Sequence, residues 1–192
     1  MKTQALVVLL VTASIPALAE TVIETKSVFD GARELSLESW YTQPTASPDD
    51  LAARDSNLGL SLFWRSTMSP GKLIITAYVR GLENIQTTNS LLLNIDGEIV
   101  SLTSVDELTE HRPYRYERNG WESWKRYEIT RETLDKIMAA SEVTVRVNLE
   151  KTYVEGVFGV KDGHTMVKLA FALFAKRLDE VQAELSGASI DD

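Results

Sequence analysis

The chain has no cysteine, and it has only two histidines, His111 and His164, among its 192 residues. The lack of cysteine excludes disulfides, thiolate metal sites, iron–sulfur clusters and cysteine nucleophiles. A catalytic zinc ion usually takes two or three imidazole ligands, whereas these two histidines lie far apart in the sequence. The sequence therefore indicates no metal site and no cofactor.

Motifs of the common catalytic classes are absent as well. The chain has no Gly-x-Ser-x-Gly nucleophile turn, no Walker phosphate loop and no glycine-rich dinucleotide fingerprint. Residues 69–72 match the Ser-x-x-Lys pattern by letter, but Pro70-Gly71 predicts a turn where that chemistry needs the start of a helix. No catalytic residue is assigned, and the sequence favours a protein that is not an enzyme.

Positive charge is scarce. The chain has 20 Lys and Arg against 28 Asp and Glu, which gives a net charge of −8 and an isoelectric point near 4.9. This balance disfavours nucleic acid as a partner. Hydrophobic residues make up 44% and charged residues 25%, as in an ordinary globular domain.

The N-terminus carries the longest apolar stretch. Lys2 precedes an apolar segment of about 11 residues, too short to span a bilayer, and Ala17-Leu18-Ala19 fits the small-residue cleavage rule. We predict that residues 1–19 are a signal peptide and that residues 20–192 form a single domain without a membrane anchor. Loss of Lys2 leaves 19 basic residues against 28 acidic ones, a net charge of −9.

Export without cysteine narrows the destination of the protein. Small secreted eukaryotic domains usually carry disulfides, and this chain also lacks an Asn-x-Ser/Thr glycosylation acceptor. Both absences are typical of bacterial export. We therefore expect a soluble periplasmic protein.

Alternating apolar residues predict half-buried strands in the first half of the domain. One strand follows Leu58 to Trp64, a second follows Leu73 to Val79 after the Pro70-Gly71 turn, and a weaker pattern covers Leu35 to Tyr41. Two further hairpins follow from pairing across a turn. A turn at Asp96-Gly97 pairs Leu93 with Val100, and a turn at Glu150-Lys151 pairs Arg146 with Glu155.

The segment between His111 and Arg131 is basic and aromatic, unlike the rest of the chain. A hairpin turn at Asn119-Gly120 would place Arg115 opposite Trp124 and gather one mixed face. Arginine and lysine beside aromatic rings suit an anionic polymer or a protein partner, although such a face also packs onto a core. The candidate ligand-binding residues are Arg112, Tyr114, Tyr116, Arg118, Trp121 and Lys125.

The same hairpin would bring two acids together. Glu117 and Glu122 would be cross-strand neighbours about 5 Å apart, close to the spacing of a retaining glycosidase. On an exposed hairpin tip nothing separates their pKa values, so we interpret them as two solvated surface acids.

Two helices are expected in the C-terminal half. Thr130 is a plausible N-cap for a helix ending near Ala140, and residues 164–185 carry an apolar stripe that includes Phe171 and Phe174. Residues 186–192 are expected to be a frayed tail.

Together these patterns predict an α+β fold, with a hairpin-rich antiparallel sheet or β-sandwich and two helices in the C-terminal half. The function expected is that of an exported binding or accessory protein of the bacterial envelope. The alternative is a secreted carboxylate-dependent hydrolase acting on an envelope polymer. The oligomeric state stays open.

Overall fold

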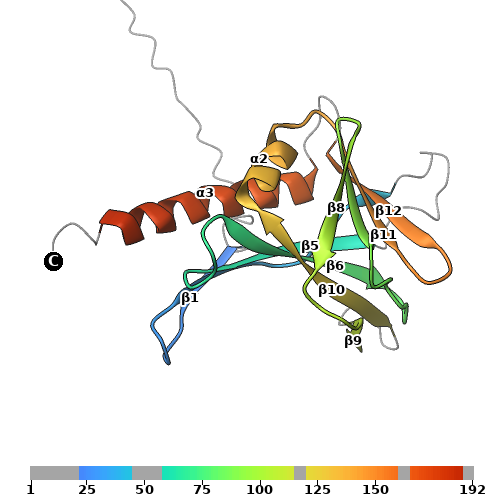
Figure 1. Ribbon diagram of the computed structural model, residues 1–192, viewed down its shortest axis with the longest axis horizontal. Helices are drawn as coiled ribbons and strands as arrows, with labels where there is room; N and C mark the ends of the chain where they lie inside the picture. The colour runs from blue at the N-terminus through green and yellow to red at the C-terminus, as the bar shows by residue number, and fades with distance from the viewer. Residues whose placement is uncertain (1–21, 45–57, 115–119, 160–164, 188–192) are drawn as a thin grey trace, which may run out of the picture.

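The computed structural model describes residues 22–44, 58–114, 120–159 and 165–187. They form an antiparallel sheet and two helices, which confirms the predicted α+β class (Figure 1). The strands are β1 (Val22–Lys26), β2 (Arg33–Leu37), β3 (Trp40–Tyr41), β4 (Gln43–Pro44), β5 (Leu58–Arg65), β6 (Lys72–Arg80), β7 (Leu91–Ile95), β8 (Glu98–Ser104), β9 (Glu110–Pro113), β10 (Trp121–Thr130), β11 (Val143–Asn148) and β12 (Tyr153–Gly159). The helices are α2 (Arg131–Ala139) and α3 (Met166–Gly187).

Strands β5 and β6 follow their predicted alternation. Leu58, Leu60 and Leu62 of β5 are buried against the core, and the alternating apolar residues of β6 lie on the same side. The turn before β6 has Gly71 at φ +73°, a conformation that glycine adopts without strain. The side of β5, β6 and β10 that faces away from the core is the outer face. It carries Gly59, Tyr78 and Trp124.

Two of the predicted hairpin registers are confirmed. Leu93 pairs with Val100 across Asp96-Gly97, both of which have positive φ. Arg146 pairs with Glu155, and the two side chains form an ion pair. Positive φ at both central residues matches the right-handed twist of the flanking strands.

The register predicted for the hairpin at Asn119-Gly120 is wrong. Trp124 pairs with Glu110 and Trp121 pairs with Pro113, while Tyr114 N–H donates to Gly120 O. The observed register differs from the predicted one by five residues. Because side chains alternate along a strand, an odd shift moves each side chain of one strand to the opposite face relative to its partner.

The strand pairings close into a ring. From β5 the order runs through β6, β10, β8, β7, β11 and β12 to β4, and the adjoining β3 pairs back onto β5. Strand β8 stands steeply to β5 and β6 (Figure 1). The chain at residues 40–44 therefore joins β5 to β12 and lies beside the outer face.

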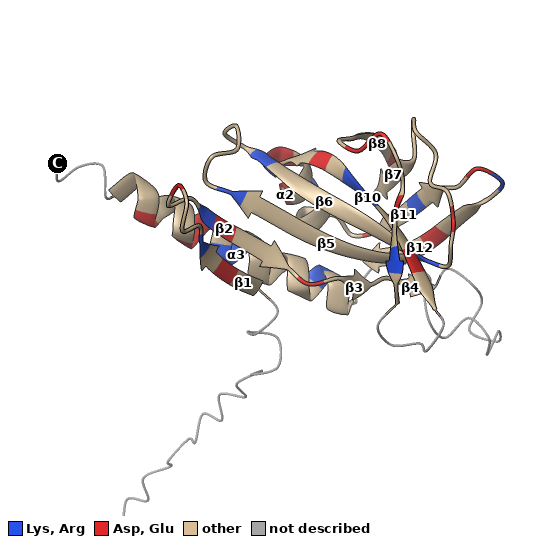
Figure 2. Ribbon diagram, turned by 90° about the horizontal axis from the view of Figure 1, so that it is seen from below, with Lys and Arg blue, Asp and Glu red and all other residues tan. Residues whose placement is uncertain are grey.

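Helix α3 covers one side of the sheet and completes the core. Val167, Phe171 and Phe174 are buried, and α3 contacts β1, β2, β3, β5 and β12. Both signs of charge meet where α3 crosses β1 and β2 (Figure 2), because Glu24 there binds Arg33 and Arg177. Helix α2 begins after Thr130, whose hydroxyl accepts from Thr133 N–H as predicted for an N-cap.

The ends of the domain differ in part from the sequence predictions. The predicted signal peptide, residues 1–19, and residues 188–192 of the predicted tail lie outside the described residues. Ser186 and Gly187, expected in that tail, instead belong to α3. Strand β1 was not predicted, since it is an edge strand in which no residue is fully buried. Among the described helices, none is long and apolar enough to cross a membrane.

Candidate functional site

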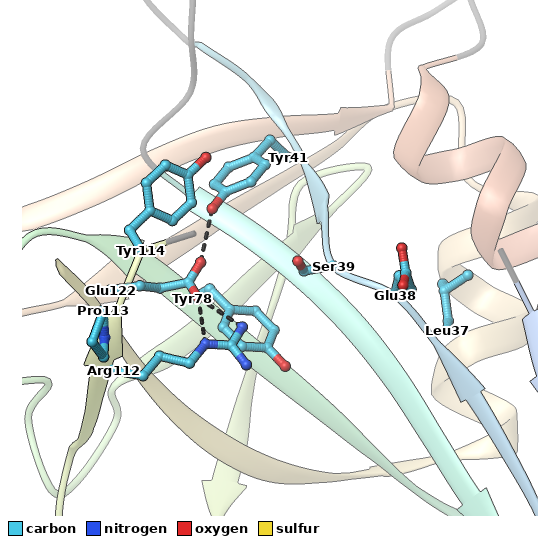
Figure 3. Close-up of a pocket in the computed structure, with 9 residues that line it drawn as sticks. All are labelled: Leu37, Glu38, Ser39, Tyr41, Tyr78, Arg112, Pro113, Tyr114 and Glu122. Atoms are coloured by element: carbon cyan, nitrogen blue, oxygen red, sulfur yellow. Dashed lines mark hydrogen bonds and ion pairs between the residues drawn. The ribbon is translucent and has the colours of Figure 1, made fainter. Parts of the chain in front are cut away.

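A cavity of about 300 Å³ lies on the outer face, where the 37–41 segment approaches β6, β9 and β10. Three tyrosines, Tyr41, Tyr78 and Tyr114, line it together with Arg112 and Glu122 (Figure 3). Leu37, Glu38, Ser39 and Pro113 complete the lining. Three segments far apart in the sequence thus supply this first cavity.

Glu122 is the central polar group of the first cavity. Its side chain is only 3% exposed. Tyr41 Oη donates to Glu122 Oε1 at 2.8 Å, while Arg112 Nε and Nη2 approach Oε2 at 2.8 and 2.7 Å. The prediction that Glu122 is a solvated surface acid is therefore wrong. Glu122 lies within the paired part of β9 and β10, opposite Arg112, and not at an exposed hairpin tip.

Arg112 presents its charge outward. Its side chain is 52% exposed, and its guanidinium carbon lies 5.0 Å from the ring centre of Tyr78. Burial acts to lower the pKa of Arg112, but the hydrogen bond to Glu122 and the electrostatic attraction of Glu122 and the nearby tyrosines together outweigh it and raise the pKa. The exposed end of the pair is therefore cationic. The guanidinium N–H groups of Arg112 that do not bind Glu122 are able to donate to a ligand.

The rings of Tyr41 and Tyr114 form one wall of the first cavity. They meet edge to face with centres 6.3 Å apart, and the guanidinium of Arg80 lies 4.7 and 5.0 Å from those centres. A Cβ at Gly59 would approach the Tyr41 ring to 3.3 Å, so glycine lets that ring lie close to β5. Burial, helped by hydrogen bonds to Tyr114 and Glu122, raises the pKa of Tyr41 and keeps its hydroxyl a donor.

A second cavity of about 360 Å³ adjoins the first along the outer face. The two share Tyr78 and Arg112. Its other lining residues are Phe63, Ile74, Thr76, Trp124 and Arg126. The outer face therefore offers two contiguous cavities rather than one isolated depression.

Arg126 repeats the arrangement of Arg112 in the second cavity. Its Nη2 lies 2.7 Å from Asp106 Oδ1, and its guanidinium carbon is 5.7 Å from the ring centre of Trp124. Asp106 is 10% exposed, whereas Arg126 is 52% exposed. Burial would raise the pKa of Asp106, but the hydrogen bonds from Arg126 and the positive charges of Arg126 and Lys125 together outweigh it and lower the pKa.

The structure separates the six residues predicted to bind a ligand. Arg112 and Tyr114 line the first cavity. Trp121 is 45% exposed but belongs to the opposite face of β10, together with Lys125, which is fully buried. Burial lowers the pKa of Lys125, and its Nζ donates to Gln86 O at 3.1 Å. Tyr116 and Arg118 lie outside the described residues, as do Arg115 and Glu117.

Sequence reasoning missed Tyr41, Tyr78, Arg80 and Arg126 as neighbours of the candidate site. Tyr78 and Arg80 occupy the outer face of β6, whose alternation could have indicated them once the pairing with β10 was known. Tyr41 reaches the cavity only because residues 40–44 cross from β5 to β12. No local pattern marks that crossing.

The outer face is better suited to binding than to catalysis. Both oxygens of Glu122 are occupied by Tyr41 and Arg112, so neither is directed at a ligand. The hydroxyl of Ser123 contacts His111 Nδ1 at 2.9 Å, but it is buried and donates to Gly81 O. That serine is therefore a structural group rather than a nucleophile.

No group of three or more His, Asp or Glu suited to a metal ion occurs among the described residues. Comparison with known proteins finds no matching family model, curated protein or solved structure. Function is therefore inferred from the geometry of the outer face.

Proposed function

We propose that the chain is an exported, non-enzymatic binding protein of the bacterial envelope that holds an anionic ligand at the first cavity. The observation that carries the proposal is the orientation of the Arg112–Glu122 pair. The carboxylate is buried and the guanidinium faces solvent, so the pair presents fixed N–H donors to an incoming acid. Tyr78 beneath Arg112 and Glu122 beside it hold the guanidinium in place.

Export is supported by the sequence alone. The segment 1–19 has the short apolar core and the Ala-x-Ala end of a signal peptide, and the chain lacks cysteine. An envelope location would supply acidic polymers at high local concentration. Such a polymer suits a face from which paired arginines point outward, on a protein whose net charge is negative.

The hydrolase alternative receives less support. An acid/base pair of carboxyl groups needs one carboxyl that can give a proton to the ligand and one that can act on it. Glu122 is engaged on both oxygens by protein groups. The observations therefore favour retention of a ligand over its cleavage.

Capture on beads carrying polygalacturonate, a carboxylated polysaccharide, tests the proposal. The full mature chain should bind these beads but not neutral dextran beads, and binding should weaken as salt rises from 0.1 to 1 M because the Debye length shrinks from about 10 to 3 Å. Arg112→Gln should lower the affinity about tenfold or more, since a charge-assisted hydrogen bond contributes about 1.5–3 kcal/mol.

The control is Arg146→Gln. Arg146 also pairs with a glutamate, Glu155, and lies over a tyrosine ring, but it lines neither cavity. Its affinity should equal that of wild type. If Arg112→Gln fails to fold, Arg112→Lys serves instead. It keeps the positive charge but loses the planar set of guanidinium N–H donors, so it should still weaken binding. Equal binding by the folded Arg112 variant, or no binding to polygalacturonate by wild type, contradicts the proposal.

A further inference from the structure

The outer face carries the same three-part unit twice. In each unit a buried or largely buried carboxylate holds an exposed arginine over an aromatic ring. The first consists of Glu122, Arg112 and Tyr78, and the second consists of Asp106, Arg126 and Trp124.

The two units are adjacent. Tyr78 and Trp124 are direct cross-strand partners of β6 and β10, which places their Cβ atoms about 5 Å apart on one face. Arg112 and Arg126 both line the second cavity. The two guanidinium groups therefore border one space.

Both units have the same polarity. The carboxylates are 3% and 10% exposed, whereas each arginine is 52% exposed. The buried acids cancel the net charge of the units but leave both cations facing outward. A ligand with a single acidic group would engage one arginine and leave the other in water.

We infer that Arg112 and Arg126 bind successive acidic groups of one chain, and that this chain is an acidic oligosaccharide lying across β6 and β10. This inference rests on the proposed function and specifies its ligand. The first cavity takes one sugar acid beside Tyr41 and Tyr114, and the second takes the next. Phe63 and Ile74 give the second cavity an apolar side against which a sugar ring can pack its C–H face.

A peptide fits the outer face less well. Peptides commonly bind sheets by adding a strand to a free edge. Here β6 is paired on both sides, by β5 and β10, and β10 is paired by β6 and by β8 and β9. Recognition must then come from side chains, and the arginines and rings of these strands supply it.

Nucleic acid is the less favoured polyanion because of charge. The net charge of the whole chain is −8. Nucleic-acid affinity comes mainly from neutralising many phosphates at once with lysine and arginine, and the two units supply two arginines. Glu38 in the first cavity adds local repulsion. A short sugar acid chain needs only the two outward cations.

A length series of galacturonate oligomers, measured by titration calorimetry on the full mature chain, tests the inference. Wild type should bind the hexamer at least tenfold more tightly than the monomer, because the longer ligand reaches both arginines. In Arg126→Gln this ratio should fall close to one. Trp124→Leu, which removes the ring but no charge, should lower the ratio as well, and Arg146→Gln should preserve it.

The outcomes separate this inference from the proposed function. Equal affinity of wild type for monomer and hexamer, with both lost in Arg112→Gln, would overturn the two-unit inference and leave the proposed function standing. No galacturonate binding at any length would overturn both. Tighter binding of an oligoglutamate of equal length would overturn the assignment of the ligand as a sugar. If Arg126→Gln does not fold, an unchanged hexamer-to-monomer affinity ratio in Trp124→Leu would overturn the role of the second unit.

Discussion

At the scale of single residues, Glu122 organises the outer face. It pairs across strands with Arg112 on one side and Arg80 on the other, and it accepts a hydrogen bond from Tyr41 of a distant segment. A buried carboxylate is costly unless its oxygens are bonded. The groups that satisfy Glu122 are the same groups that shape the first cavity.

Tyr41→Phe should therefore destabilise the protein although it removes one oxygen atom. The change deletes the donor to Glu122 Oε1, and a hydrogen bond to a charged group contributes about 1.5–3 kcal/mol. Chemical denaturation measures the loss. Tyr153→Phe is the control, since Tyr153 is exposed and its change should cost less than about 0.5 kcal/mol. A Tyr41→Phe variant as stable as this control would show that the hydrogen bond does not contribute to the free energy of unfolding.

Tyr127 makes the stability depend on pH in the alkaline range. Its hydroxyl shares a buried hydrogen bond of 2.9 Å with Ser90, and burial raises its pKa to about 12. Between about pH 10, where an unfolded tyrosine ionises, and pH 12 the unfolded chain binds fewer protons. Stability therefore falls as pH rises through this window.

Tyr127→Phe should reduce that alkaline loss by up to about 1.4 kcal/mol per pH unit. At neutral pH the same variant should be less stable by about 1–3 kcal/mol, because Ser90 loses its buried partner. Denaturation curves at pH 7, 10 and 11.5 measure both effects. Parallel stability profiles for the variant and wild type would contradict this role of Tyr127.

At the scale of elements, α3 and the strand ring depend on each other. The stripe of α3 packs on the sheet, and Phe171 meets Phe158 of β12 edge to face with ring centres 4.8 Å apart. Arg177 and Glu24 tie the helix to β1 at 2.6 Å. The helix is therefore part of the core rather than a free surface for a partner helix.

Phe171→Ala should destabilise the protein by about 3–5 kcal/mol, as expected when a fully buried phenylalanine is truncated. Leu185→Ala lies on the same helix but at a position that is 41% exposed, and it should cost much less. Thermal and chemical denaturation compare the two. A loss below about 0.5 kcal/mol for Phe171→Ala would mean that the stripe does not pack as described.

The sequence allowed the prediction of elements whose pattern is local. The alternation of β5 and β6, the Asp96-Gly97 turn and the Thr130 cap all act over a few residues. The β9–β10 register could not be predicted in this way. Asn119-Gly120 is a strong local turn signal, but burial of Tyr127 and Lys125 and the pairing of Arg112 with Glu122 decide the register through distant contacts.

The candidate site was predictable only in part for the same reason. Arg112 and Tyr114 stood out because the segment around them is basic and aromatic. Lys125 belongs to that segment and yet is buried, since the pairing of β10 with β6 places it beside Ala77 on the core side. The odd register shift puts Arg112 on the opposite face from Lys125. Tyr41 and Tyr78 come from segments with no such bias, and only the strand ring brings them to Arg112.

At the scale of the whole molecule, the export proposal predicts where the mature chain begins. The mature chain should begin at or within a few residues of Glu20, because Ala17-Leu18-Ala19 fits a cleavage site. N-terminal sequencing of the protein recovered from a bacterial periplasmic fraction measures this. Recovery of intact chain beginning at Met1 or Lys2 in that fraction would contradict the export proposal.

The central claim is that the outer face, and not the Trp121 side of β10, holds an acidic ligand. An NMR titration of the mature protein with hexagalacturonate tests it most directly. We predict the largest shifts at Tyr78, Arg112 and the indole N–H of Trp124, with little change at Trp40, which packs against the core. Shifts confined to Trp121 and its neighbours, or no shifts at saturating ligand, would contradict the claim.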